Sequence, residues 1–172
     1  FGKWSRPDYN TVVATFCHNI ARDVEIQISD PDRKLELVYI DDVVKEFVTL
    51  LSSDVHTGLN RRDITPVHRI SLGQLADELY EFRKMRNTLL IPDFQDRFLQ
   101  CLYATYLSFL PEEGFSYLTE LRTDERGSLS ELLKSQQFGQ IFVSTTHPGI
   151  IRGNHYHNTK TEKFIVIKGK GL

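Results

Sequence analysis

The chain has 172 residues, of which 40% are hydrophobic and 26% are charged, and its formal net charge is −2. This length and hydrophobic content suffice for a buried core, and the charge balance gives no sign of nucleic-acid binding. No apolar run is long enough to cross a bilayer and no signal peptide is recognisable, so we expect a cytoplasmic protein without membrane insertion. Cys17 and Cys101 fit no metal-ligand spacing and are expected to stay reduced.

The first 51 residues predict a helix, two short strands and a second helix. Apolar residues at helical spacing place the first helix at residues 9–22, with Asp8 as its cap. One strand is expected at residues 25–28 and another where apolar residues alternate from residue 35 to residue 39. Asp41 or Asp42 is then expected to cap a helix with an apolar stripe.

Two more amphipathic helices are predicted before residue 110. The first follows Ser71 and Gln74, which have the spacing of a capping box. The second covers residues 93–109, and we expect its aromatic side chains to form core rather than a binding surface. Tyr80 and Lys84 have the Tyr-x3-Lys spacing of a reductase catalytic pair, but we interpret them as residues of an ordinary helix.

Pro111 to Gly114 interrupt the helical pattern, and the chain beyond them is turn-rich and strand-rich. A short helix is predicted for SLSELLKS at residues 128–135, followed by a β-branched strand at residues 139–145. We therefore predict an α/β domain at residues 1–112 and a β-rich domain at residues 113–172.

The segment from Gly149 to Gly169 has the spacing Gly-x5-His-x-His-x4-Glu-x6-Gly. In a strand, His155 and His157 would share one face, and a returning strand that begins at Glu162 would bring the carboxylate beside both rings. Two imidazoles and a carboxylate suit Zn, Fe(II), Ni or Mn, so the spacing leaves the metal open. We predict a metal site at these three residues, with zinc as the expected ion.

This spacing resembles the first motif of the cupin superfamily, and the resemblance covers about residues 118–172. It implies the first part of a jelly-roll domain, because the later cupin motif with its further histidine ligand is not seen. Some cupin epimerases of sugar nucleotides use a motif histidine as a base without any metal. His155 is therefore a candidate for either role, catalytic base or metal ligand.

Residues 1–109 resemble the C-terminal, substrate-binding half of an extended, Rossmann-type short-chain dehydrogenase/reductase that acts on nucleotide sugars. The resemblance rests on the Phe1-Gly2 loop, the helix and strand after it, and the segment LVYIDD. It implies that Arg6 and Asn10 contact the substrate. The Gly-rich cofactor loop and the catalytic Tyr-x3-Lys pair are not found where the family order requires them, so NADPH would be bound mainly by residues outside this chain.

The chain departs from that family at the position where many relatives carry an arginine that holds the pyrophosphate. Leu35 stands there, and Arg33 or Lys34 in the preceding turn could take its place. A guanidinium can pair two of its N–H groups with phosphate oxygens, whereas a lysine offers only a point charge. Arg33 is therefore the third predicted substrate contact.

A nucleotide-sugar reductase followed by a cupin resembles the bifunctional capsular-polysaccharide enzymes that make UDP-2-acetamido-2,6-dideoxy-L-talose. The resemblance implies that the cupin epimerises a UDP-4-keto-6-deoxy-N-acetylhexosamine at C3 and that the reductase reduces its C4 ketone with NADPH. A homodimer is expected, and the abrupt start at Phe1 suggests an internal fragment that is inactive alone. Two alternatives stay open: a non-catalytic metal-binding cupin module with a helical association domain, and a helical interaction protein.

Overall fold

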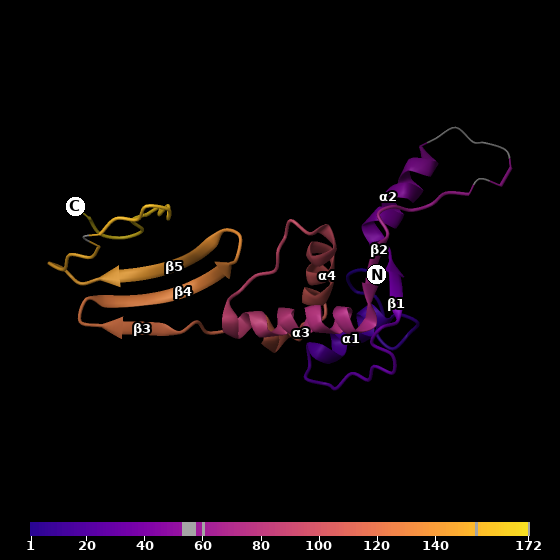
Figure 1. Ribbon diagram of the computed structural model, residues 1–172, viewed down its shortest axis with the longest axis horizontal. Helices are drawn as coiled ribbons and strands as arrows, with labels where there is room; N and C mark the ends of the chain where they lie inside the picture. The colour runs from indigo at the N-terminus through magenta and orange to yellow at the C-terminus, as the bar shows by residue number, and fades with distance from the viewer. Residues whose placement is uncertain (53–57, 60, 154, 172) are drawn as a thin grey trace.

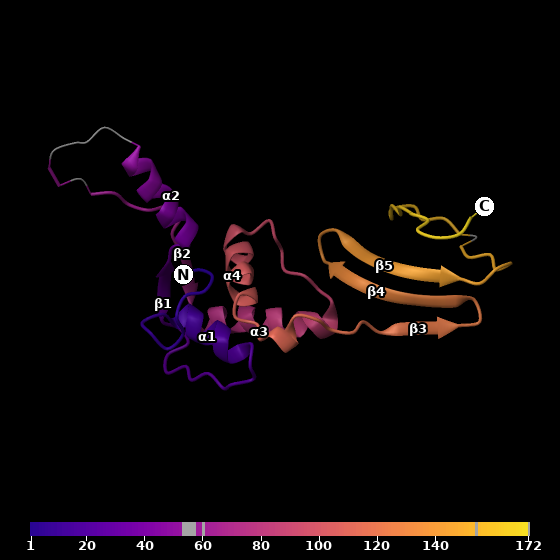
Figure 2. The ribbon, with the colours of Figure 1, turned by 180° about the vertical axis from the view of Figure 1, so that it is seen from behind.

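The computed structural model describes residues 1–52, 58–59, 61–153 and 155–171. The described elements are α1 (Val12–Ile20), β1 (Lys34–Leu37), α2 (Ile40–Leu51), β2 (His68–Ser71), α3 (Leu72–Thr88), α4 (Arg97–Leu107), the 3-10 helix η1 (Glu112–Gly114), β3 (Leu121–Asp124), β4 (Gly127–Ser135) and β5 (Gly139–Thr146). The helices lie on one side of the molecule and the sheet β3-β4-β5 on the other (Figures 1 and 2). The predicted mixture of helices and sheets is confirmed, while a doubly wound Rossmann sheet is not among the described elements.

Helices α1, α3 and α4 pack around one hydrophobic core. Their fully or nearly buried side chains recur at helical spacing: Val13, Ala14, Phe16, Cys17, Ile20, Leu75, Ala76, Leu79, Phe82, Leu102, Tyr106 and, just after α4, Phe109. Each large side chain buried in this way stabilises the fold by about 1.5–3 kcal/mol. Among the aromatic residues of 93–109, which are expected to form core, Tyr106 is buried, whereas Phe94 is 38% exposed.

The predicted capping box of α3 is confirmed by two reciprocal hydrogen bonds. The backbone N–H of Gln74 donates to Ser71 Oγ at 3.2 Å, and the backbone N–H of Ser71 donates to Gln74 Oε1 at 3.0 Å. Asp96 caps α4, because its Oδ1 accepts from the backbone N–H groups of Phe98 and Leu99. These caps satisfy N–H groups that have no partner within the helix.

The other two predicted caps are wrong. Thr11 caps α1 by accepting from the N–H of Ala14, and Asp8, with a left-handed φ of 55°, lies outside the helix. At α2, Tyr39 is the N-cap residue and makes no side-chain cap bond. Asp41 and Asp42 lie instead in the first turn of α2, where their charge interacts favourably with the positive end of the helix dipole.

Two predicted elements are also wrong. Residues 25–28 form no strand, and Ile26 and Ile28 instead pack from a loop against the helical core. The helix predicted at 128–135 is strand β4, which pairs antiparallel with β3 on one side and β5 on the other. Hydrogen bonding to two neighbouring strands outweighs the local helical pattern.

The helical side and the sheet are joined at a short parallel bridge between Leu90 and Lys134. The N–H of Ile91 donates to the Lys134 carbonyl at 2.9 Å, and the N–H of Lys134 donates to the Leu89 carbonyl at 2.7 Å. The boundary predicted between residues 112 and 113 falls within η1 and stays a prediction. Among the helices that the structure describes, none is long and apolar enough to span a bilayer.

Candidate functional site

The two motif histidines and the motif glutamate lie close together after β5. The rings of His155 and His157 are 4.8 Å apart, centroid to centroid, in an edge-on arrangement, and His157 Nε2 lies 3.6 Å from Glu162 Oε1. His157 therefore lies next to both of the other side chains, while no contact between Glu162 and His155 is found among the described residues. The strands predicted to carry these side chains are not found, because residues 155–157 and 162–167 form no regular structure.

A lysine shares the carboxylate with His157. Lys160 Nζ lies 2.6 Å from Glu162 Oε1, and its hydrogen bond is the main cause that lowers the pKa of Glu162. Partial burial opposes this effect, and electrostatic interactions with Lys160, His157 and His155 lower the pKa further. Glu162 is consequently ionised at neutral pH, as a metal ligand must be.

The donor set fits zinc by its chemistry, because neutral imidazoles and carboxylates are ordinary zinc ligands. Within the described residues, however, no three His, Cys, Asp or Glu side chains are arranged to hold an ion. What the structure shows is a histidine–carboxylate pair with Lys160 on the carboxylate. A metal would have to displace that lysine, and the metal site stays a prediction.

The three predicted substrate contacts lie on exposed loops of the helical side. The Arg6 guanidinium lies 5.3 Å from the ring centroid of Tyr9, and Asn10 has a left-handed φ of 53°. Arg33 precedes β1, and its carbonyl accepts from the N–H of Leu72 at 2.9 Å. No contact among the described residues joins Arg33 to Arg6 or Asn10, so a shared substrate site stays a prediction.

The loop that carries Arg6 and Asn10 is fixed at its start. The terminal ammonium of Phe1 donates to the Val38 carbonyl at 2.8 Å, and the N–H of Ile40 donates to the Phe1 carbonyl at 2.8 Å. A Cβ atom at Gly2 would lie 2.2 Å from Ile40 Cγ2, so only glycine fits there. The Phe1-Gly2 pair therefore holds the loop against the start of α2.

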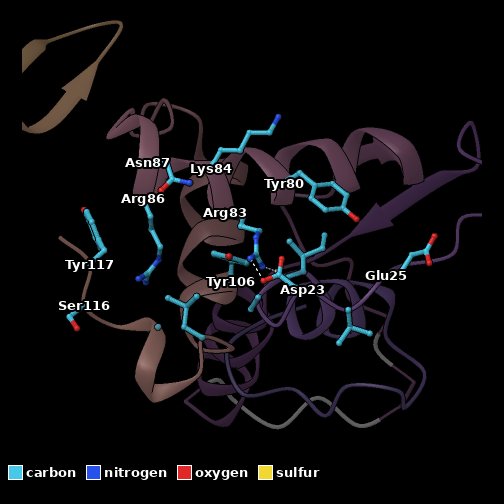
Figure 3. Close-up of a pocket in the computed structure, with 15 residues that line it drawn as sticks. Asp23, Glu25, Tyr80, Arg83, Lys84, Arg86, Asn87, Tyr106, Ser116 and Tyr117 are labelled. Atoms are coloured by element: carbon cyan, nitrogen blue, oxygen red, sulfur yellow. Dashed lines mark hydrogen bonds and ion pairs between the residues drawn. The ribbon is translucent and has the colours of Figure 1, made fainter. Parts of the chain in front are cut away.

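A second site was not predicted from the sequence. It is a pocket of about 660 Å³ between the end of α1, the second half of α3 and the chain around η1 (Figure 3). Arg83 reaches across it, donates to the Ile20 carbonyl and pairs with Asp23. The one signal in the sequence is the run of basic residues late in α3, a segment whose pattern predicts only an amphipathic helix.

Comparison with known proteins finds a matching family and a related enzyme. Residues 122–172 match the family described as "Polysaccharide biosynthesis C-terminal domain". Over 169 residues the chain is 49% identical to a UDP-2-acetamido-2,6-beta-L-arabino-hexul-4-ose reductase of Pseudomonas aeruginosa. The aligned region covers 98% of this chain and 45% of that protein.

Two solved structures are similar as well. The capsular polysaccharide assembling protein CapF from Staphylococcus aureus is 40% identical, with a TM-score of 0.82, over 92% of this chain and 46% of that one. CapF with the inhibitor 3-isopropenyl-tropolone has a TM-score of 0.84 at 40% identity, over 92% and 46% of the two chains. The chain thus spans less than half the length of these relatives.

The alignment with the Pseudomonas reductase runs through both the helical side and the sheet, because it covers 98% of the chain. A chance likeness of one short motif is thereby excluded. The resemblance that the sequence suggests is confirmed: this chain is a homologue of the Pseudomonas UDP-2-acetamido-2,6-beta-L-arabino-hexul-4-ose reductase and of the capsular polysaccharide assembling protein CapF.

Proposed function

We propose that the chain serves capsular-polysaccharide precursor biosynthesis as part of an enzyme that epimerises and reduces a UDP-4-keto-6-deoxy-N-acetylhexosamine. The observation that carries this proposal is the 49% identity over 169 residues to an enzyme named as a reductase of a UDP-2-acetamido-hexulose. The likeness to CapF supports the assignment to capsule assembly. Because the chain spans 45% of that reductase, the proposal concerns an enzyme of the relative's length.

The epimerisation at C3 is assigned to the part of the chain that carries the histidines. Removing a proton beside a ketone creates an enolate, whose charge must be stabilised, and the proton needs a base. An imidazole nitrogen of His155 would accept it, while Glu162 orients the neighbouring His157 ring from 3.6 Å. In the alternative role of His155 as a metal ligand, zinc held by these three side chains would polarise the ketone, and the base would be another group.

The reduction of the C4 ketone with NADPH is assigned to the helical side and to residues beyond this chain. Arg6, Asn10 and Arg33 would contact the UDP part of the substrate, where guanidinium groups suit phosphate oxygens. All three lie on exposed loops, and the loop of Arg6 and Asn10 is anchored at Phe1. A cytoplasmic homodimer completes the proposal.

Metal content and proton exchange test the epimerase part in the enzyme at the length of its relatives. The double variant His155→Ala, His157→Ala should lose about one bound zinc per chain and also lose deuterium wash-in at C3 of the keto-sugar. His147→Ala, an exposed histidine after β5, is the matched control and should keep both.

The two measurements separate the roles. Loss of exchange in His155→Ala with metal content unchanged would assign the base to His155. Loss of metal in either single variant would assign the ligands. If the double variant keeps both the metal and the exchange, the epimerase assignment of these histidines is wrong. If the parent binds a metal that the double variant loses, but the parent shows no exchange, the non-catalytic cupin module is favoured.

A further inference from the structure

The pocket beside α3 has no part in the proposed reaction. Its volume of about 660 Å³ is in the range of small-molecule sites. It is built from segments far apart in the sequence, namely residues 20–25, residues 80–87 and residues 114–117, with Tyr106 and Leu110 between them. Figure 3 looks into this space and shows polar side chains around it.

Three basic residues of α3 line the pocket, and only one of them is available to a ligand. Arg83 is engaged within the protein by the Ile20 carbonyl and Asp23. Lys84 pairs with Glu81 at 2.7 Å, and its side chain points away from the other lining residues (Figure 3). Arg86 has no carboxylate partner among the described residues.

Arg86 is nevertheless held in place. It is partly buried, and its guanidinium lies 5.3 Å from the ring centroid of Tyr117. A guanidinium that stacks on a ring with its face keeps its N–H groups free at the edge, in the fork that fits two phosphate oxygens. Asn87 and Ser116 flank it at the same end of the pocket (Figure 3), and neither side chain makes a hydrogen bond within the described part of the chain.

The other end of the pocket has a different character. Tyr80, whose side chain is 38% exposed, and Glu25 lie there, away from Arg86 (Figure 3). A tyrosine ring can stack on a flat base, and a carboxylate can accept hydrogen bonds from hydroxyl or N–H groups. The pair of Arg83 and Asp23 between the two ends is neutral overall. The pocket thus offers an anion site at one end and an aromatic, hydrogen-bond-accepting site at the other.

We propose that this pocket is a second ligand site, which takes a nucleoside phosphate. The phosphate pairs with Arg86 and accepts from Asn87 and Ser116, and the nucleoside extends toward Tyr80 and Glu25. Bound ligand would connect α3 to residues 114–117, close to the bridge at which Leu89 and Ile91 meet Lys134 of β4. Such a ligand would therefore stiffen the join between the helical side and the sheet.

Calorimetric titration of the chain with UDP tests the site, with UMP, uridine and inorganic phosphate as further probes. Arg86→Ala should weaken UDP binding about tenfold or more, because a charge-assisted pair is lost, and Arg86→Lys should weaken it less. Lys45→Ala, at an exposed lysine of α2 outside the pocket, is the control and should leave the affinity unchanged. Uridine should bind more weakly than UDP.

Arg6→Ala distinguishes this site from the proposed substrate site. UDP binding that Arg6→Ala abolishes and Arg86→Ala leaves intact would overturn the pocket proposal while supporting the substrate site. The reverse pattern would support the pocket alone. Equal affinity of the parent and Arg86→Ala, or no UDP binding by the parent, rejects the pocket as a nucleoside-phosphate site.

Arg86→Ala also removes the contact with Tyr117, so its folding is checked by thermal unfolding. Asn87→Asp provides a variant that keeps this contact, at an exposed position near the end of α3. Its added negative charge should repel the phosphate and weaken UDP binding several-fold. A folded Asn87→Asp variant with unchanged affinity would contradict the proposed phosphate position.

Discussion

The helical side and the sheet of this protein place their apolar side chains differently. The hydrophobic core lies between Val13 and Phe109, and the sheet β3-β4-β5 adds no apolar residue to it. Every position of β5 is exposed, including Ile141 at 59%. Three helices can enclose a core among themselves, whereas a single sheet buries a face only when another layer covers it.

The difference is one of packing partners rather than of helix against strand. Helix α2 has a marked apolar stripe, yet none of its residues is buried, and Phe47 and Leu51 are 60% and 87% exposed. It extends away from the bundle of α1, α3 and α4 (Figure 1). An amphipathic pattern thus specifies which face an element can bury, and the tertiary arrangement decides whether that face is buried.

Removing a core side chain should have the largest effect on stability. Leu79→Ala, at a core position of α3 with 0% exposure, should lower the free energy of unfolding by about 2–5 kcal/mol. Ile141→Ala on β5, where the side chain is 59% exposed, should change it by less than about 1 kcal/mol. Urea unfolding followed by circular dichroism measures both, and equal losses would mean that the sheet is buried in solution.

The ionic link between α1 and α3 should come next. Arg83→Ala removes a bond to the Ile20 carbonyl and the pair with Asp23, and should cost about 1.5 kcal/mol. The matched change in the sheet is Arg126→Ala, which removes an ion pair with Asp124 at the exposed β3–β4 turn. Water screens this pair, so its loss should not measurably change the free energy of unfolding. A double-mutant cycle of Arg83 with Asp23 measures how much of the stability lost in Arg83→Ala comes from the ion pair. A coupling energy near zero would assign that loss to the hydrogen bond with the Ile20 carbonyl.

Loss of the capping box should have a smaller effect. Ser71→Ala leaves the N–H of Gln74 without its acceptor and should lower the free energy of unfolding by about 1 kcal/mol. Ser144→Ala on the exposed strand β5 is the control and should be close to neutral. Thermal unfolding of both variants checks this, and a neutral Ser71→Ala would show that the tertiary contacts of α3 alone fix its start.

The parts of the fold that the sequence predicts correctly depend on local signals. Ser71 and Gln74 form a capping box because the two residues lie within one turn, and the apolar stripes of α3 and α4 become core. Residues 128–135 fit a helix and a strand about equally well, and only pairing with β3 and β5 decides between them. Distant partners of that kind cannot be read from the segment itself.

The same limit applies to the two sites. Spacing predicts that His157 and Glu162 meet, because five residues can turn back without a regular hairpin. The pocket at Arg86 escapes prediction, because residues 20–25 and 114–117 reach it from nearly a hundred residues apart. Whether Arg6 and Arg33 share a substrate site is likewise a question of tertiary placement.

The smallest predicted effect concerns pH and a carboxylate of the helical side. Burial is the main cause that raises the pKa of Glu78 above its ordinary value of 4.5. Three nearby carboxylates raise it further: Asp96, Glu81 and Asp77. The folded state then binds this proton more tightly than the unfolded chain, so the contribution of Glu78 to stability falls as the pH rises through this pKa.

Glu78→Gln should therefore raise the free energy of unfolding at pH 7, by less than about 0.5 kcal/mol because the half-buried group is still partly screened by water, and should leave it unchanged at pH 3. Glu125→Gln, in the exposed turn between β3 and β4, provides the control on the sheet side and should change the free energy of unfolding by less than about 0.5 kcal/mol. Urea titrations at both pH values measure the difference. Destabilisation by Glu78→Gln at pH 7 would contradict the prediction, because it would mean that the ionised carboxylate is favourable where α3 and α4 approach each other.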